Sequence, residues 1–148
     1  MDAEIRIDLK GFDTANGVLS QVDVELRKAC QWVIKAAKAQ MMLPKHGTVV
    51  QYYVGQQKYS TKTGKPLKRR MKTHIQSAPG EAPAVRTGQL YNSFFTHPGI
   101  RFLEYVVGVN APYGRYLEEE LDRPFLISNA TIMGRLLVEK VKRLLSGV

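Results

Sequence analysis

A long run of helical periodicity that ends at a proline constrains the fold more than any other feature. Its apolar stripe comprises Val22, Leu26, Ala29, Val33 and Ala36 or Ala37, and Gln40 continues it. Residues at this spacing share one face of an amphipathic helix. We predict a helix from about Ala15 or Leu19 to Met42, which Pro44 ends. So long an apolar face requires a sheet or other helices to cover it.

Two segments with strand character lie far apart in the chain. Glu4–Leu9 alternates apolar and charged residues, and Ile100–Val109 is apolar enough for a central strand. Near the C-terminus, Ser128 or Asn129 is expected to cap a helix that runs to about Leu145. The 148 residues suit one domain. We predict an α+β fold: a small, mainly antiparallel sheet packed against one long helix, with short helices, a C-terminal helix and a long basic arm.

The charge of the chain is unevenly distributed. The net charge is +9, and no Asp or Glu occurs between Glu25 and Glu81. Within residues 45–77 we expect Thr48–Val54 to form a strand and Gln56–Lys72 to form an exposed loop. The basic side chains expected on this arm are Lys58, Lys62, Lys65, Lys68, Arg69, Arg70 and Lys72. Such asymmetry indicates an anionic partner: nucleic acid, an acidic protein surface or a neighbouring copy.

Two short motif segments follow the basic region. In Ala78–Leu90, two prolines and a glycine indicate a stiff loop, after which Thr87 is expected to cap a short helix. Leu90, Tyr91, Phe94 and Phe95 would give that helix apolar contacts. A second short helix is expected to open at Pro112, with Asn110 as its cap, and to end before Arg123. Tyr113 and Tyr116 would lie on one face of it, where we expect them to pack in the core or at an interface.

The order of these motifs resembles the head-to-tail connector (neck) and tail-component family of long-tailed bacteriophages. The residues that carry the resemblance are Arg86, Thr87, Gly88, Leu90, Ser93, Tyr113, Tyr116, Glu118, Arg123, Pro124, Phe125 and Leu126. The resemblance implies a structural virion protein that is made in the host bacterial cytoplasm and forms a six- or twelve-fold ring. Its neighbours would be a head-closure or adaptor ring and a tail terminator or tail tube, and genomic DNA would pass through the lumen.

Nothing in the sequence indicates catalysis. The three histidines, His46, His74 and His97, stand in separate contexts without a metal-ligand spacing, and Cys30 is alone. We therefore expect no catalytic residue, metal or cofactor, and a buried, reduced Cys30. The chain lacks an apolar run of about 18 residues, so no membrane span is expected.

Charged residues near the second motif have a structural interpretation. Glu118 is expected to pair with Arg86 or Arg123 and so to fix the two motif segments together. An acidic patch for a neighbouring subunit would comprise Glu118, Glu119, Glu120 and Asp122. For the basic arm, docking on protein ranks first, contact with DNA second and an idle solvated loop third. The alternatives to a neck protein are a small basic nucleic-acid-binding protein and a tail-terminator or minor tail protein.

Overall fold

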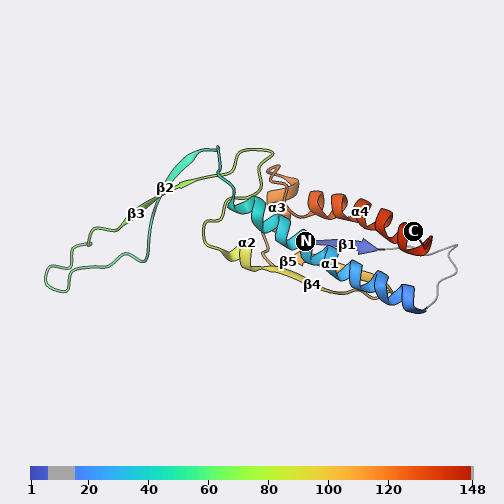
Figure 1. The fold of residues 1–148 in the computed structure, drawn as a ribbon. Coiled ribbons are helices and arrows are strands. Elements are labelled where there is room, and N and C mark those ends of the chain that lie inside the picture. The colour runs from blue at the N-terminus through green and yellow to red at the C-terminus, as the bar shows by residue number, and fades with distance from the viewer. Residues whose placement is uncertain (7–15, 148) are drawn as a thin grey trace.

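The computed structural model describes residues 1–6 and 16–147, and their arrangement is drawn in Figure 1. The elements in chain order are β1 (Asp2–Arg6), α1 (Asn16–Met42), β2 (Val49–Tyr53), β3 (Met71–Ile75), α2 (Gln89–Asn92), β4 (Phe94–Pro98), β5 (Glu104–Val109), α3 (Gly114–Glu119) and α4 (Ile127–Leu145). We call residues 45–77 the arm and the other described residues the body. The predicted α+β class is confirmed.

The body consists of a three-stranded antiparallel sheet with helices on one face. The strand order is β1-β5-β4, so β5 is central, as predicted. In the register, Ile5 lies opposite Tyr105 and Thr96 opposite Val107. Helix α1 packs against β4, β5 and α4, and α4 also contacts β1. The core therefore lies between the sheet and the α1–α4 pair.

The periodicity predicted for α1 is confirmed by its burial. The side chains of Val22, Leu26, Val33 and Ala37 are fully buried, and Ala29 is nearly so. Cys30 is also fully buried as a free thiol, and desolvation raises the pKa of this thiol.

The start of α4 differs from the prediction. The helix begins at Ile127, so Ser128 and Asn129 lie inside it and neither is its cap. Asn129 is instead a buried bridge between helices: its side-chain amide donates to Phe125 O (2.7 Å) and to Gln40 Oε1 (2.9 Å). A buried amide must find such partners, which explains why Gln40 continues the α1 stripe.

Two strand predictions need correction. The predicted strand from Ile100 begins only at Glu104, because Ile100 and Phe102 lie exposed in the turn between β4 and β5. Strand β1 covers Asp2–Arg6, and the predicted continuation to Leu9 lies outside the described residues.

The helix predicted to contain Phe94 and Phe95 is also wrong in its extent. Helix α2 ends at Asn92, and both phenylalanines belong to β4. At the junction the Ser93 hydroxyl donates to Leu90 O, and Asn110 N donates to Ser93 O. Pairing with Gly108 of β5 satisfies the backbone of Phe95, and Phe94 continues the same strand opposite Val109. Helical spacing cannot detect this pairing because β5 lies further along the chain.

Candidate functional site

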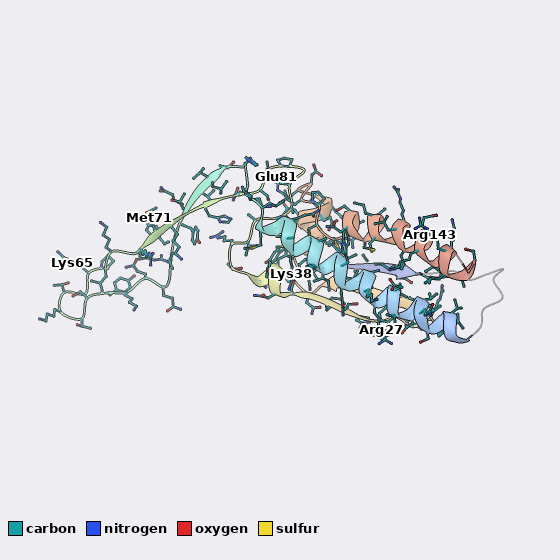
Figure 2. All side chains as sticks on the ribbon, viewed as in Figure 1. Arg27, Lys38, Lys65, Met71, Glu81 and Arg143 are labelled. Atoms are coloured by element: carbon teal, nitrogen blue, oxygen red, sulfur yellow. The ribbon has the colours of Figure 1, made fainter. Side chains whose placement is uncertain are left out.

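The arm is a hairpin that extends away from the body (Figure 1). Strands β2 and β3 pair only with each other, with Val50 opposite His74. The strand predicted at Thr48–Val54 is confirmed, whereas the predicted loop Gln56–Lys72 contains the start of β3. Figure 2 shows Lys65 near the far end of the arm and Glu81 where the arm joins the body.

The basic residues of the arm are largely free of the body. The arm carries eight Lys and Arg residues and no acid. Of the seven predicted to face a partner, Lys58, Lys62, Lys65, Lys68, Arg70 and Lys72 are exposed. Arg69 is half-buried, because its guanidinium lies over the Tyr53 ring, 5.0 Å from the centroid, and donates to Gly55 O. Arg69 therefore shapes the arm itself, and the other six are available to an anionic surface.

One face of the hairpin carries two exposed apolar pairs, with Gln51 and Thr73 between them. Val49 and Ile75 lie opposite each other, as do Tyr53 and Met71, and their exposed fractions are 60%, 45%, 57% and 48%. Side chains opposite each other in a pair point to the same face of a sheet. A lone two-stranded hairpin is marginally stable in water. The arm therefore presents an apolar face that a partner would stabilise.

Glu81 ties the two legs of the arm to the body. Its carboxylate accepts hydrogen bonds from Ala78 N (2.8 Å) and His46 N (3.2 Å), and its second oxygen lies 2.6 Å from His46 Nδ1. The bond from Ala78 N, together with the His46 side chain, lowers the pKa of Glu81 to about 2. Gly47 N also donates to Gln76 O, which joins the legs directly. We call the contacts of Glu81 with His46 and Ala78, together with the bond from Gly47 N to Gln76 O, the arm root.

Acid is expected to loosen the arm root through Glu81. Because its folded-state pKa of about 2 lies below its ordinary value of 4.5, the carboxylate adds stability above pH 4.5 that is lost as the pH falls toward 2. The free energy of unfolding, measured with urea, should therefore fall more steeply between pH 4.5 and pH 2 for the wild type than for Glu81→Gln. The exposed Glu120→Gln is the matched control and should follow the wild type. Identical pH dependence of Glu81→Gln and the wild type would contradict this role.

The two motif segments meet at one groove beside the arm root. This groove has a volume of about 450 Å³ and is lined by Arg86, Thr87, Gly88, Leu90, Tyr113 and Arg123, among others. Arg86 also reaches the arm, since its guanidinium lies 4.4 Å from the centroid of the Tyr52 ring. Among the residues that carry the resemblance, Arg86 therefore packs the arm against the body.

Other motif residues serve the interior of the body. Phe125 and Leu126 are fully buried and Pro124 is half-buried. Thr87 does not cap α2: the cap position is Gly88, in the left-handed region at φ 79°, and Thr87 Oγ1 accepts only a long bond from Gln89 N (3.4 Å).

Glu118 has a different role from the one predicted. Among the described residues it forms no ion pair with Arg86 or Arg123, and Arg123 donates to Leu121 O instead. Its carboxylate accepts from Leu126 N (3.1 Å) and Ile127 N (2.7 Å), so it caps α4 from the end of α3. Desolvation raises the pKa of Glu118, and the bonds from the backbone N–H groups oppose that rise.

The remaining residues of the second motif divide between the core and the solvent. Helix α3 begins at Gly114 with Tyr113 as its cap residue, so Asn110 is not the cap and Pro112 precedes the helix. Tyr113 packs against the core, whereas Tyr116 is 54% exposed. Packing in the core therefore applies to Tyr113 alone, and packing of Tyr116 at an interface stays a prediction. Glu119 pairs with Arg115 (2.7 Å), and Glu120 and Asp122 are exposed. The predicted acidic patch therefore loses Glu118 to the interior and keeps three members.

The histidines stay apart in the structure. His46 bonds Glu81, His74 lies edge-on to Tyr52, and His97 stacks on Phe95. Across residues 1–6 and 16–147, no group of three or more His, Cys, Asp or Glu is placed to hold a metal ion. No helix in the same ranges is long and apolar enough to cross a membrane.

Sequence reasoning missed two features of this site. The bond network of Glu81 leaves no local pattern, because His46 lies 35 residues away. The apolar face of the arm was visible as Val49, Tyr53, Met71 and Ile75 at alternate positions of two segments.

Comparison of the chain with models of known protein families, with curated proteins and with solved structures gave no match.

Proposed function

We propose that this protein is a structural component of a tailed-bacteriophage virion that forms a ring at the head–tail junction. The ring would join the portal or head-closure assembly to the tail and surround the DNA channel. The observation that carries the proposal is the arm, a basic hairpin with an uncovered apolar face that projects from a packed body. The motif order seen in the sequence adds the virion context.

A projecting arm suits a ring because ring contacts are heterologous. In a closed ring each copy meets its neighbour through two different patches, one on each side. The arm supplies one such patch, and it bears the six exposed cations named above, whereas Glu119, Glu120 and Asp122 lie on the body. Six- and twelve-fold rings both satisfy this geometry, as would the ring of a tail terminator.

Charge reversal on the arm is expected to weaken self-association. The test variant replaces Lys65, Lys68 and Arg70 by Glu and spares Arg69, whose side chain shapes the arm. A control with the same net charge reverses three exposed body residues, Lys35, Arg101 and Arg143. Mass photometry at low salt should show rings for the wild type and the control but fewer for the arm variant, because salt screens such contacts. Equal ring formation by both variants would contradict docking through the arm.

Binding of DNA is the second candidate function, favoured by the six exposed cations of an acid-free arm. Neutralising phosphates releases counterions, so affinity falls steeply with salt. If all six contacted phosphates, the slope of log K against log salt would be roughly −5. Titration of labelled duplex at two salt concentrations separates the candidates. A steep slope with a monomeric protein would favour the nucleic-acid-binding protein over the ring.

A further inference from the structure

The outer edge of β1 is an unpaired strand edge among the described residues. Val109 N donates to Met1 O, and antiparallel strands exchange bonds at every second residue. The backbone groups of Ala3 and Ile5 therefore point toward β5, and those of Asp2, Glu4 and Arg6 point away from the sheet. Such an edge is a template for another strand.

A groove runs along this edge beneath α4. It has a volume of about 850 Å³ and is lined by all five residues of β1 and by one side of α4. That side carries Ile127, Thr131, Gly134 and Val138 at helical spacing. Ile127 and Val138 are 42% and 40% exposed, and the space beside the Gly134 Cα is open. The groove thus joins a free strand edge to an uncovered apolar stripe.

The arm has the complementary edge. Val54 N donates to Arg70 O and Gln76 N to Thr48 O, which sets the alternation of the hairpin bonds. The backbone groups of Met71, Thr73 and Ile75 therefore point outward from β3, and their side chains lie on the apolar face of the arm. Strands β1 and β3 are both five residues long.

We propose that β3 of one copy adds in parallel to the free edge of β1 in a second copy, with the apolar face of the arm covering the groove under α4. This inference rests on the proposed ring. It names the surface that receives the arm, and each interface of the ring would then contain one sheet built from the arm of one copy and the body of the next.

The direction of the added strand follows from the face of the sheet on which its apolar side chains must lie. Strands in an antiparallel pair bond between residues that point to the same face, so Met71 and Ile75 would join Asp2 and Glu4 on the side away from α4. In a parallel pair each residue bonds to the two neighbours of the residue at its own level. Parallel addition therefore turns Met71 and Ile75 to the side of Ala3 and Ile5, which faces the helices.

Charge supports β3 over β2 as the strand beside β1. With β3 in parallel, Lys72 comes level with Asp2, and His74 comes level with Glu4 on the outer face. With β2 in the same position, Val50 and Tyr52 would lie beside these carboxylates. Opposite charges across a strand pair favour it, so β3 is the better occupant.

Cysteine cross-linking between two differently tagged copies tests the pairing. Asp2→Cys in one copy and Lys72→Cys in the other should cross-link within assembled rings, and Cys30 does not interfere because it is fully buried. The pair Arg6→Cys and Met71→Cys is the control for direction, since antiparallel addition would place those two side chains opposite each other on one face. Rings that lack the Asp2–Lys72 link, or link only through Arg6, overturn the strand pairing and leave the ring intact. A chain that stays monomeric overturns both proposals.

Blocking the groove provides an independent test. Gly134→Trp would fill the open space beside α4, whereas the matched control Gly134→Ala leaves the groove wide. We expect self-association at least about tenfold weaker for the Trp variant and unchanged for the Ala variant. Circular dichroism of the monomers establishes that both fold. A folded Trp variant that assembles like the wild type overturns the groove as the docking site.

Discussion

Replacing Phe125 by alanine is expected to lower the free energy of unfolding by about 3–5 kcal/mol. The phenyl ring of Phe125 is fully buried, and it meets the phenyl ring of Phe94 edge-on with centroids 6.0 Å apart. Phe125 directly precedes the capped start of α4, so the cavity would open where α3, α4 and the sheet meet. The neighbouring backbone is held by Glu118, which limits collapse into the space. Urea unfolding followed by circular dichroism measures the change.

Phe102→Ala is the matched control for that prediction. Phe102 lies in the turn before β5 and is 75% exposed, so its removal creates no cavity. We expect the free energy of unfolding to stay within about 0.5 kcal/mol of the wild type. Similar losses in the two variants would mean that Phe125 is not part of a close-packed core.

The elements with strong local periodicity could be predicted from the sequence. The stripe of α1 repeats over several turns, and its buried residues are those that the spacing selects. The apolar run that ends at Val109 gave the central strand for the same reason, although its first residues form a turn. In both cases residues that are close in sequence determine which side chains are buried.

Predictions failed where a distant segment decides the local structure. Phe94 and Phe95 fit helical spacing from Leu90, but the hydrogen bonds offered by β5 make them a strand. Glu118 was expected to need a cation, yet the N–H groups at the start of α4 satisfy it. A carboxylate can be satisfied by either, and only the packing of α3 against α4 distinguishes them.

The candidate site divides in the same way. The basic charge of the arm was evident, since it depends on composition alone. The contacts at its base were not, because His46 bonds Glu81 and Arg86 packs on Tyr52 only when both legs of the hairpin meet the loop after residue 77. An arm that presents an apolar face to a neighbour needs such a root, since a freely rotating arm would lose more entropy on docking.

Replacing Gly47 by alanine is therefore expected to disturb the arm root and to cost about 1–3 kcal/mol of folding free energy. A Cβ at this position would come within 2.8 Å of the Ser77 backbone and would also strike Gln76 O. Backbone atoms cannot rotate aside as a side chain can, so the two legs must separate and the bond from Gly47 N to Gln76 O is lost. Urea unfolding measures the cost, and mass photometry measures the expected weakening of the ring.

Gly17→Ala is the control for this substitution, because a Cβ there meets nothing within 4 Å and the residue lies at the start of α1. Alanine in a helix is favoured over glycine, so the free energy of unfolding of this variant should equal that of the wild type or exceed it by up to about 1 kcal/mol. If Gly47→Ala behaves like Gly17→Ala in both assays, the close approach of the two legs does not position the arm. If it loses stability yet assembles normally, the root stabilises the body, and the neighbouring copy alone orients the arm.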